Sequence, residues 1–393
     1  MLDYSRRSMV SNKKIALFEQ GCFSGCNFLL SLLVLYKFSP ADFVSYNNIL
    51  MIVYVLMGVA RNYISIQIII TDRFCLNFYV CLLIIFTLVS SVVFLLVDFF
   101  YIKNIFINLF VVFIGFALYE FSRRIMYKFE MGNRIILLGF LNLFSFLISI
   151  SYLYFYNLSY DELLKMYFSI MSISFFIIFK LKNGNSNFVD SFNSYVEGFK
   201  NASWLFMSGL VYSFYNQFFY LYASRQLSIE QMSVLYFLRT TLQPVQVLIA
   251  AFDSIDKVKF KKNIQDKIFT LNYMCNVQYK LMACCSAYFC LLGVSLSIYC
   301  LIEKIDLSID KMIFFVCLAI VYLSMCFVQP MESILVVMKK SVLLFMLRVF
   351  GTILMLLSLQ LFSDFYIVFS MLFPWLLISI VLRVKIKNMS LVK

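Results

Sequence analysis

The segment NFLLSLLVLYKFSPADFVSY at residues 27–46 has a weaker second copy, NQFFYLYASRQLSIEQMSVL, at residues 216–235. The two copies lie 189 residues apart, which is close to half of the 393-residue chain. Three polar positions in or beside these segments align: Ser24 with Ser213, Asn27 with Asn216, and Ser39 with Ser228. The sequence therefore predicts two similar halves, each opening with the same pair of segments joined by a short turn.

The composition places both halves in a membrane. Hydrophobic residues make up 63% of the chain and charged residues only 13%, whereas about a quarter of the residues in soluble domains are charged. The formal charge of +13 is carried by Lys and Arg in short gaps between apolar runs, so it indicates topology and not a nucleic-acid-binding face. We expect an all-α polytopic membrane protein, surrounded by membrane lipids and without a nucleic-acid partner.

The apolar runs predict twelve membrane helices, because a span needs about 20 apolar residues. They lie near residues 15–36, 43–70, 75–97, 104–121, 135–155, 162–179, 202–223, 231–254, 281–302, 312–337, 342–361 and 364–382. The repeat offset equals six of these helices, so both copies enter the membrane in the same direction. This pattern predicts two parallel six-helix lobes around an axis along the membrane normal. Pro330 is expected to kink a continuous helix.

The lobes are assigned to residues 1–180 and 201–393, with a cytoplasmic linker at residues 181–200. Four aromatic residues in this linker recur at helical spacing: Phe188, Phe192, Tyr195 and Phe199. This spacing is typical of a helix that lies in the membrane interface.

The distribution of positive charge predicts the orientation. One alternate set of gaps contains 25 Lys and Arg residues, among which we count Arg123, Arg124 and Arg348, and the other set contains 6. The positive-inside rule places the richer set, and with it both termini, in the cytoplasm. Two cations, Arg61 and Arg239, remain inside predicted helices.

Three predicted helices carry polar residues along one face, at steps of three or four residues. These stripes are Gln20, Ser24, Asn27 and Ser31; Asn47, Met51, Tyr54, Gly58, Arg61 and Ser65; and Arg239, Gln243, Gln246, Ala250 and Asp253. Pro244 lies within the third stripe and is expected to bend its helix. A cleft between the lobes would collect the stripes, but Ser, Asn and Gln also join packed membrane helices by hydrogen bonds.

The two intramembrane arginines need a specific explanation. A central arginine costs about 3 kcal/mol in a membrane helix, and its side chain does not lose its proton. Arg61 and Arg239 either face a wet passage, as two stations at different depths for one anion, or form buried ion pairs. For a pair with Arg61, the candidate partners are Glu19 and Asp253.

Catalytic and metal-binding motifs are not found in the sequence. The eleven cysteines lie mostly in apolar runs, and the chain contains no histidine, so the cysteines are interpreted as packing residues and no metal site is expected. No nucleophile with an adjacent base, Gly-rich phosphate loop or large external loop is present. We therefore expect neither an enzyme nor a cofactor.

Residues 16–50, ALFEQGCFSGCNFLLSLLVLYKFSPADFVSYNNIL, resemble the opening helix pair of bacterial polysaccharide flippases of the Wzx type. These flippases belong to the multidrug/oligosaccharidyl-lipid/polysaccharide (MOP) superfamily, which includes MATE-like transporters. The features in common are Glu19 and Gln20, then Ser24 and Asn27, and the turn FSPADFVSY at residues 38–46. Residues 202–255, which include Asn216, are similar to the seventh and eighth helices of that family.

The resemblance implies a V-shaped bundle that moves an undecaprenyl-diphosphate-linked oligosaccharide, such as an O-antigen repeat unit, across the bacterial inner membrane by alternating access. It implies a cationic lumen, which Arg61 and Arg239 would supply, and possible partners in a polysaccharide polymerase and a chain-length regulator. Tyr54 is a candidate for stacking against a sugar. The alternative is a cation-coupled multidrug or metabolite antiporter of the same superfamily, with Glu19 and Asp253 as coupling carboxylates.

Overall fold

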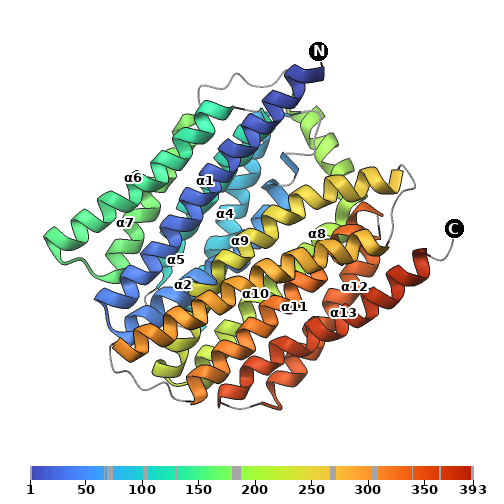
Figure 1. The fold of residues 1–393 in the computed structure, drawn as a ribbon. Coiled ribbons are helices and arrows are strands. Elements are labelled where there is room, and N and C mark those ends of the chain that lie inside the picture. Colours follow the sequence, from blue (N-terminus) through green and yellow to red (C-terminus); the bar gives the residue numbers. More distant parts are fainter. Residues whose placement is uncertain are drawn as a thin grey trace. The chain divides into compact units, whose positions relative to one another are not determined.

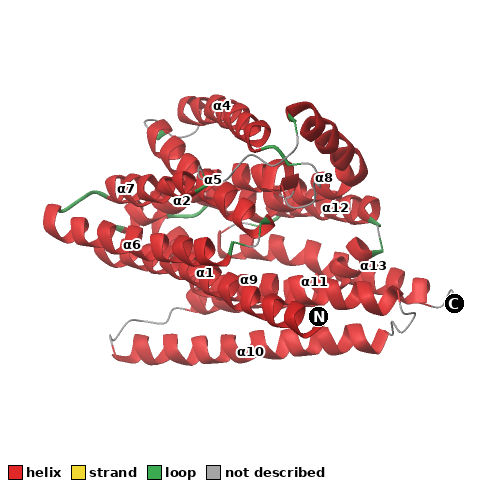
Figure 2. Ribbon diagram, turned by 90° about the horizontal axis from the view of Figure 1, so that it is seen from above, coloured by secondary structure: helices red, strands yellow, loops and turns green. Residues whose placement is uncertain are grey.

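The computed structural model is almost entirely helical (Figure 1, Figure 2). It describes residues 2–65, 67–68, 74–100, 105–129, 131–178, 187–265, 271–302, 309–338, 340–362 and 364–390. Within these ranges no β-strand occurs. The chain divides into two compact units, Met1–Leu221, here called unit 1, and Tyr222–Lys393, here called unit 2.

Unit 1 is a bundle of long helices. Its elements are α1 (Leu2–Lys37), α2 (Pro40–Ala60), the π-helix η1 (Arg61–Ser65), α4 (Leu76–Phe100), α5 (Phe106–Lys128), α6 (Gly132–Tyr156), α7 (Tyr160–Ser172), the 3-10 helix η2 (Ile173–Ile177) and all but the end of α8 (Phe188–Gln226). α5 lies at the centre, because it packs against α2, α4, α6, α7 and η1. Leu109, Val112 and Phe113 of α5 are fully buried.

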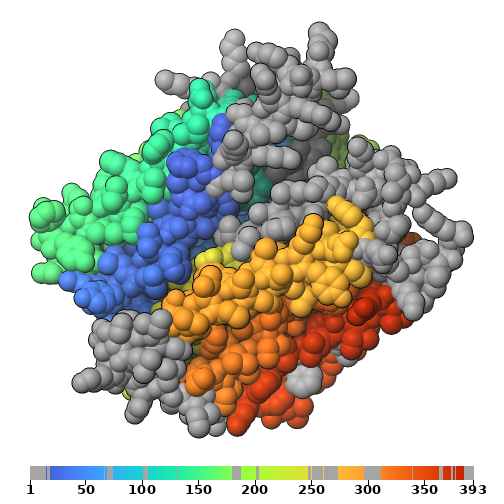
Figure 3. All heavy atoms as spheres, in the orientation of Figure 1, coloured from blue at the N-terminus to red at the C-terminus, as the bar shows by residue number. Residues whose placement is uncertain are grey.

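Unit 2 is a second helical bundle with its own central helix. Its elements are α9 (Ile229–Gln265), α10 (Leu271–Ile302), α11 (Ile309–Val337), α12 (Ser341–Leu359), the 3-10 helix η3 (Asp364–Val368) and α13 (Phe369–Ser390). α11 packs against α9, α10, α12 and α13. The helices α6 and α10 show outer faces of their units in Figure 3, in keeping with exposed apolar residues such as Phe140 and Leu291.

Each of the twelve predicted membrane helices overlaps one described α-helix, which confirms the all-α prediction. α9 continues through Pro244 and α11 continues through Pro330. Eight described segments are long and apolar enough to cross a membrane: Phe18–Lys37, Pro40–Ser65, Leu76–Phe100, Phe106–Lys128, Gly132–Tyr156, Tyr273–Ser295, Lys311–Val337 and Ser341–Leu359. The protein is therefore a multi-pass membrane protein.

Several of the cations that we assigned to gaps lie inside helices, and three of these form ion pairs. Arg123 and Arg124 belong to α5, which continues to Lys128 instead of ending near residue 121, and Arg348 lies within α12. α5 extends beyond the apolar run because Glu120 forms ion pairs with Arg123 and Arg124, three and four residues further along the helix. Such pairs stabilise a charged helical turn.

The two sequence copies make the same local hydrogen bonds. Ser39 caps α2 in a reciprocal capping box with Asp42, and before α9 the amide of Ser228 donates to Gln231 Oε1 (3.0 Å) while the amide of Gln231 donates to Ser228 Oγ (3.3 Å). Equivalent asparagines also behave alike, since Asn27 donates to the carbonyl of Phe23 and Asn216 to the carbonyl of Tyr212, each at 3.0 Å.

The turns that follow the two central helices are also equivalent. After α5, the amide of Met131 donates to the carbonyl of Met126 at 2.9 Å, and after α11 the amide of Lys340 donates to the carbonyl of Leu335 at 2.9 Å. These bonds match with an offset of 209 residues. The α5–α6 and α11–α12 turns therefore share one helix-ending hydrogen bond.

α8 runs without a break from the predicted linker into the seventh predicted span. Near its start, the rings of Phe188 and Phe192 lie edge-on to Phe78 of α4, with centroids 5.2 and 6.2 Å away. Further along, Gly58 of α2 makes room for Ser213, because a Cβ on Gly58 would lie 2.2 Å from Ser213 Oγ. α8 therefore packs against α2 and α4, while the lobe boundaries and the interfacial position of the linker stay predictions.

We expect Gly115→Ala to destabilise unit 1. A Cβ at this position would lie 2.1 Å from the carbonyl oxygen of Phe168 in α7, so α5 and α7 would have to separate, at a cost of about 1–3 kcal/mol. Thermal unfolding of the purified protein measures the change. Gly25→Ala is the matched control, because no atom lies within 4 Å of a Cβ there and alanine favours the helix by about 0.5–1 kcal/mol. Equal melting temperatures would contradict this close helix contact.

Candidate functional site

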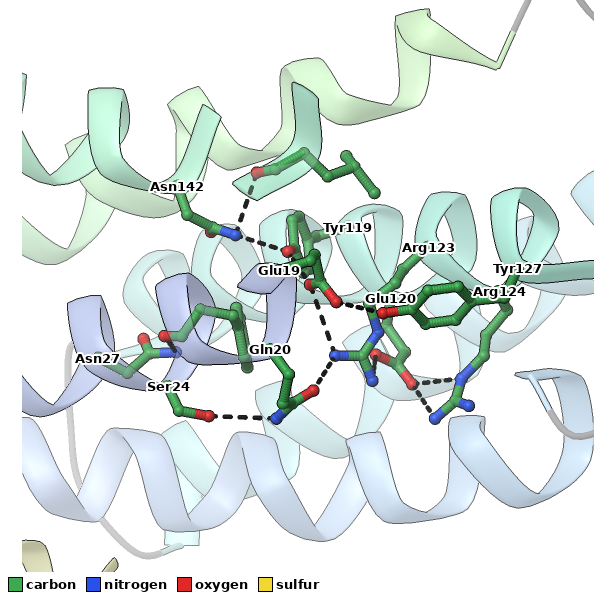
Figure 4. A network of polar contacts seen from close by, with 12 residues as sticks. Glu19, Gln20, Ser24, Asn27, Tyr119, Glu120, Arg123, Arg124, Tyr127 and Asn142 are labelled. Atoms are coloured by element: carbon green, nitrogen blue, oxygen red, sulfur yellow. Dashed lines mark hydrogen bonds and ion pairs between the residues drawn. The ribbon is translucent and has the colours of Figure 1, made fainter. Parts of the chain in front are cut away.

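Charged and polar side chains from four elements of unit 1 meet beside α5 (Figure 4). Positions 119, 120, 123, 124 and 127 follow one another at alternate steps of one and three residues, so they share one side of α5. Further members come from α1, η1 and α6. The charged side chains form what we call the ionic cluster: Glu19, Arg61, Glu120, Arg123 and Arg124.

Glu120 is the carboxylate that three guanidinium groups share. Its Oε2 lies 2.9 Å from Arg123 Nη2. Its Oε1 lies 2.7 Å from Arg124 Nη2 and accepts a 2.8 Å hydrogen bond from Arg124 Nε. The Nε of Arg61 lies further away, 3.5 Å from the same Oε1. The side chain of Glu120 is only 2% exposed, so these cations replace the water that its charge would otherwise need.

Glu19 is the second carboxylate of the ionic cluster and is completely buried. Tyr119 donates a hydrogen bond to its Oε1, and Tyr127 donates one to its Oε2 at 2.5 Å. Arg123 Nη1 lies 3.7 Å from Oε1. Both oxygens of Glu19 therefore have hydrogen-bond donors within the protein.

Neutral side chains complete the network around Arg123. The Nη1 of Arg123 donates to Gln20 Oε1 at 2.7 Å, and Gln20 Nε2 donates to Ser24 Oγ at 3.1 Å. Asn142 of α6 donates to the hydroxyl of Tyr119 at 2.5 Å. Arg123 is therefore held by α1 and α5 together, and its side chain is 7% exposed.

The ionic cluster carries one positive charge in excess, because three guanidinium groups face two carboxylates. Arg61 is its most exposed member, with 48% of its side chain accessible, compared with 21% for Arg124. Arg61 also begins η1, where α2 gives way to a π-helix. The site therefore has a partly exposed arginine side chain at the edge of a buried and largely compensated network.

Arg61 forms an ion pair, but not with an expected partner. We proposed Glu19 or Asp253, whereas the structure pairs Arg61 with Glu120 and pairs Glu19 with Arg123. The side chain of Asp253 lies outside the described part of the chain. The expectation for Glu19 is wrong because α5 places Arg123 between Glu19 and Glu120, so that each carboxylate has a nearer cation.

The polar stripe that continues from α2 into η1 is buried at three of its six positions, 47, 51 and 65. Asn47 is 1% exposed and donates to the carbonyl of Phe43 in its own helix at 2.9 Å. Tyr54 lies edge-on to Phe116 of α5 at a centroid distance of 5.7 Å, and Ser65 is 4% exposed. By contrast, the stripe of α1 is partly accessible, since Gln20, Ser24 and Asn27 are all half-buried.

The remaining predicted site residues lie on α8 and α9. Asn216 of α8 is half-buried. On α9, Arg239 is 9% exposed, Gln243 is half-buried, and Gln246 donates to the hydroxyl of Tyr322 in α11 at 3.2 Å. The structure thus brings Glu19, Gln20, Ser24 and Arg61 together around α5, and it places Arg239 in unit 2.

Unit 2 contains a buried ion pair of its own. Arg348 of α12 reaches Glu332 of α11 with two hydrogen bonds, Nε to Oε1 at 3.2 Å and Nη2 to Oε2 at 2.6 Å. Glu332 is only 3% exposed as a side chain. The turn equivalence between the halves places Glu332 at the position of Arg123 and Arg348 at the position of Gly139. The two halves therefore carry opposite charges at corresponding sites on their central helices.

The sequence did contain a signal for the residues that we missed. Glu120 lies inside the run 104–121 and Glu332 inside the run 312–337, and a carboxylate in such a run is rarely unpaired. Glu120 also precedes two arginines by three and four residues, which is the spacing of pairs on one helix face. The tyrosines and the asparagine gave no comparable signal. They are Tyr119, Tyr127 and Asn142.

No protein-family model matches the chain, and no curated protein matches it in sequence. Solved structures do match its fold. An inward-facing multidrug resistance MATE family transporter of the MOP superfamily gives a TM-score of 0.62 at 12% identity, over 97% of this chain and 96% of the other. An outward-facing one gives 0.59 at 12% identity, over 98% and 97%.

A MOP superfamily transporter from Pyrococcus furiosus, described as having a binding pocket of reverse polarity that suggests a different function, gives 0.58 at 11% identity, over 98% of this chain and 96% of the other. The chain has the fold of the MOP superfamily transporters. Identity at this level establishes the fold alone, and the matched proteins are transporters and not enzymes.

We expect Glu19→Gln to destabilise this MOP-type fold by about 3–5 kcal/mol. The change leaves Arg123 with less buried negative charge, and breaking one side of a buried ion pair has this cost. Thermal unfolding in detergent measures it. Glu197→Gln, on an exposed position of α8, is the control and should stay within about 0.5 kcal/mol of wild type. A Glu19→Gln variant as stable as this control would show that Glu19 does not hold Arg123 in place.

Proposed function

We propose that the protein moves an undecaprenyl-diphosphate-linked oligosaccharide, such as an O-antigen repeat unit, across the bacterial inner membrane by alternating access. The observation that carries the proposal is Arg61, a half-exposed guanidinium beside an ionic cluster with one positive charge in excess. A charge of this kind in a membrane protein marks a pathway or a binding site more often than a packing contact.

A diphosphate has the chemistry that this site favours. It carries about two negative charges, and guanidinium groups bind phosphate oxygens with paired hydrogen bonds. The half-buried amides and hydroxyl on α1, from Gln20, Ser24 and Asn27, offer hydrogen-bond partners for a sugar near the same cluster. Asn216, Gln243 and Gln246 are proposed for later contacts, and Arg239 is proposed as a second station for the anion.

The fold supports a transport mechanism. The matched MATE family transporters have been seen in inward-facing and outward-facing conformations. The Pyrococcus furiosus transporter, with its binding pocket of reverse polarity, suggests that one fold serves ligands of different charge. We propose cytoplasmic termini for this chain from the distribution of Lys and Arg.

The alternative function is a cation-coupled antiporter, which needs a carboxylate that exchanges its cation with solvent. Glu19 would be this group in unit 1, but it is completely buried, and both its oxygens accept hydrogen bonds from tyrosines. Glu120 is likewise occupied by Arg123 and Arg124. The arrangement therefore favours an anionic ligand at Arg61 over cation exchange at either carboxylate.

We expect Arg61→Ala to slow lipid translocation by about tenfold or more, the equivalent of one lost charge-assisted contact. The purified protein is reconstituted in vesicles with a fluorescently labelled undecaprenyl diphosphate that carries one N-acetylglucosamine. Dithionite, which reduces the label in the outer leaflet alone, reports the rate of flipping. Arg61→Lys should retain part of the rate, because it keeps the charge without the planar donors.

Arg383→Ala is the matched control, because Arg383 is an exposed guanidinium near the end of α13 and far along the chain from the ionic cluster. It should flip the lipid at the wild-type rate. Wild-type flipping by Arg61→Ala would refute a role for the charge. A wild-type protein that leaves the lipid in place but exchanges a cationic dye for protons or sodium would establish the antiporter instead.

A further inference from the structure

The three cations around Glu120 are not held equally. Arg124 approaches Oε1 at 2.7 and 2.8 Å and Arg123 approaches Oε2 at 2.9 Å, whereas Arg61 remains at 3.5 Å (Figure 4 shows the first two). Arg123 and Arg124 lie on the same helix as Glu120, so their pairing does not depend on another element. Arg61 comes from η1 and is the most exposed of the three.

We propose that Glu120 is an internal counter-anion for Arg61, which the diphosphate of the substrate replaces during binding. The inference rests on the proposed function and adds a specific role to a residue that does not itself contact the substrate. In the empty site Arg61 pairs with Glu120, and in the loaded site Arg61 pairs with phosphate oxygens. Glu120 is therefore a residue that sets the affinity of the site for anions.

Separating Arg61 from Glu120 costs little free energy, because Glu120 keeps its other ion-pair partners. Its oxygens remain bonded to Arg123 and Arg124, so no buried carboxylate is left without a partner. Arg61, in turn, is never without a nearby anion, since Glu120 takes it back when the ligand departs. A guanidinium with no counter-anion would retain a diphosphate more tightly and release it more slowly.

Glu120 also limits which anions occupy the site. Glu120 competes with the ligand for Arg61. It therefore lowers the affinity of the site for every anion by the same factor, because only the fraction of sites in which Arg61 is free of Glu120 can bind. An anion with one negative charge, such as the headgroup of an ordinary acidic lipid, then binds too weakly to fill the site. A diphosphate with about two charges still binds, because its attraction to the guanidinium is larger.

The backbone at Arg61 suits a side chain that changes partners. Arg61 is the first residue of η1, and its amide donates to the carbonyls of Gly58 and Met57 at the end of α2. Asn62, the next residue, is fixed by a 2.8 Å bond to the carbonyl of Gly58 and by Gly209 of α8, whose missing Cβ would lie 2.6 Å from it. The base of Arg61 is therefore anchored while its guanidinium remains accessible.

Binding of two probes to the full-length protein in nanodiscs tests the role of Glu120. Inorganic pyrophosphate represents a free diphosphate, and farnesyl diphosphate represents a lipid headgroup. We expect Glu120→Gln to bind both probes about three- to tenfold more tightly than wild type, the range for removal of a partly exposed ion-pair partner. Tighter binding of farnesyl diphosphate than of pyrophosphate would identify the lipid as the source of the anion.

A double variant separates competition from a general change of charge. Arg61→Ala combined with Glu120→Gln should bind no more tightly than Arg61→Ala alone, because the competitor acts through Arg61. If the double variant still gains affinity, Glu120 acts through Arg123 and Arg124, and the proposal is wrong. Unchanged or weaker binding by Glu120→Gln, or no binding of either probe to wild type, would also overturn it.

Glu120→Asp keeps the test decisive if Glu120→Gln does not fold. Aspartate retains the charge and its neighbours on α5, but it is one methylene shorter and therefore lies further from Arg61. We expect it to bind the probes about two- to threefold more tightly than wild type. The flipping rates of wild type and Arg61→Ala test the proposed function separately, so either idea can fail alone.

Discussion

The structure of unit 1 depends on Arg123, a buried guanidinium that lies between two buried carboxylates. Glu120 reaches it from the same helix and Glu19 reaches it from α1, with side chains that are 2% and 0% exposed. Burying either carboxylate without a cation would carry a large desolvation cost, and so would burying Arg123 without the carboxylates. The three charges therefore join α1 to the central helix α5 at one level. Tyr119 and Tyr127 donate hydrogen bonds to Glu19, and Gln20 accepts one from Arg123.

This arrangement explains why the excess charge is found at Arg61. The carboxylate oxygen with which Arg61 pairs, Glu120 Oε1, is already bonded to Arg124. Arg61 therefore sits at 3.5 Å from that oxygen, with about half of its side chain exposed. The same interactions that stabilise the bundle thus leave one guanidinium loosely held at its edge. Glu120 thus contributes to the stability of the bundle, and we propose that it also tunes ligand binding through Arg61.

The sequence predicted the helices better than the site. Apolar runs of about 20 residues are strong signals, and each of the twelve predicted runs overlaps a helix. Ser39 and Ser228, which the repeat aligns, both make N-cap hydrogen bonds. The site was harder, because hydropathy ended α5 near residue 121 and so assigned Arg123 and Arg124 to a loop. Helix spacing identified Arg61, but a stripe on one helix does not reveal which partner a neighbouring helix supplies. Glu120 was therefore missed as the partner of Arg61.

Each unit has a buried charged residue on its central helix, and the two charges have opposite signs. Arg123 on α5 corresponds to Glu332 on α11, and Gly139 on α6 corresponds to Arg348 on α12. In unit 1, α1 packs closely against Gly139, since a Cβ there would lie 3.0 Å from the ring of Phe18, and the partner carboxylate, Glu19, lies on that helix. In unit 2, the partner is Arg348 itself, bonded twice to Glu332. This pair joins two neighbouring helices, α11 and α12. The ionic cluster of unit 1 instead joins α1, η1 and α5 and has three guanidinium groups for two carboxylates. This surplus of positive charge is the reason that we propose the anion site in unit 1.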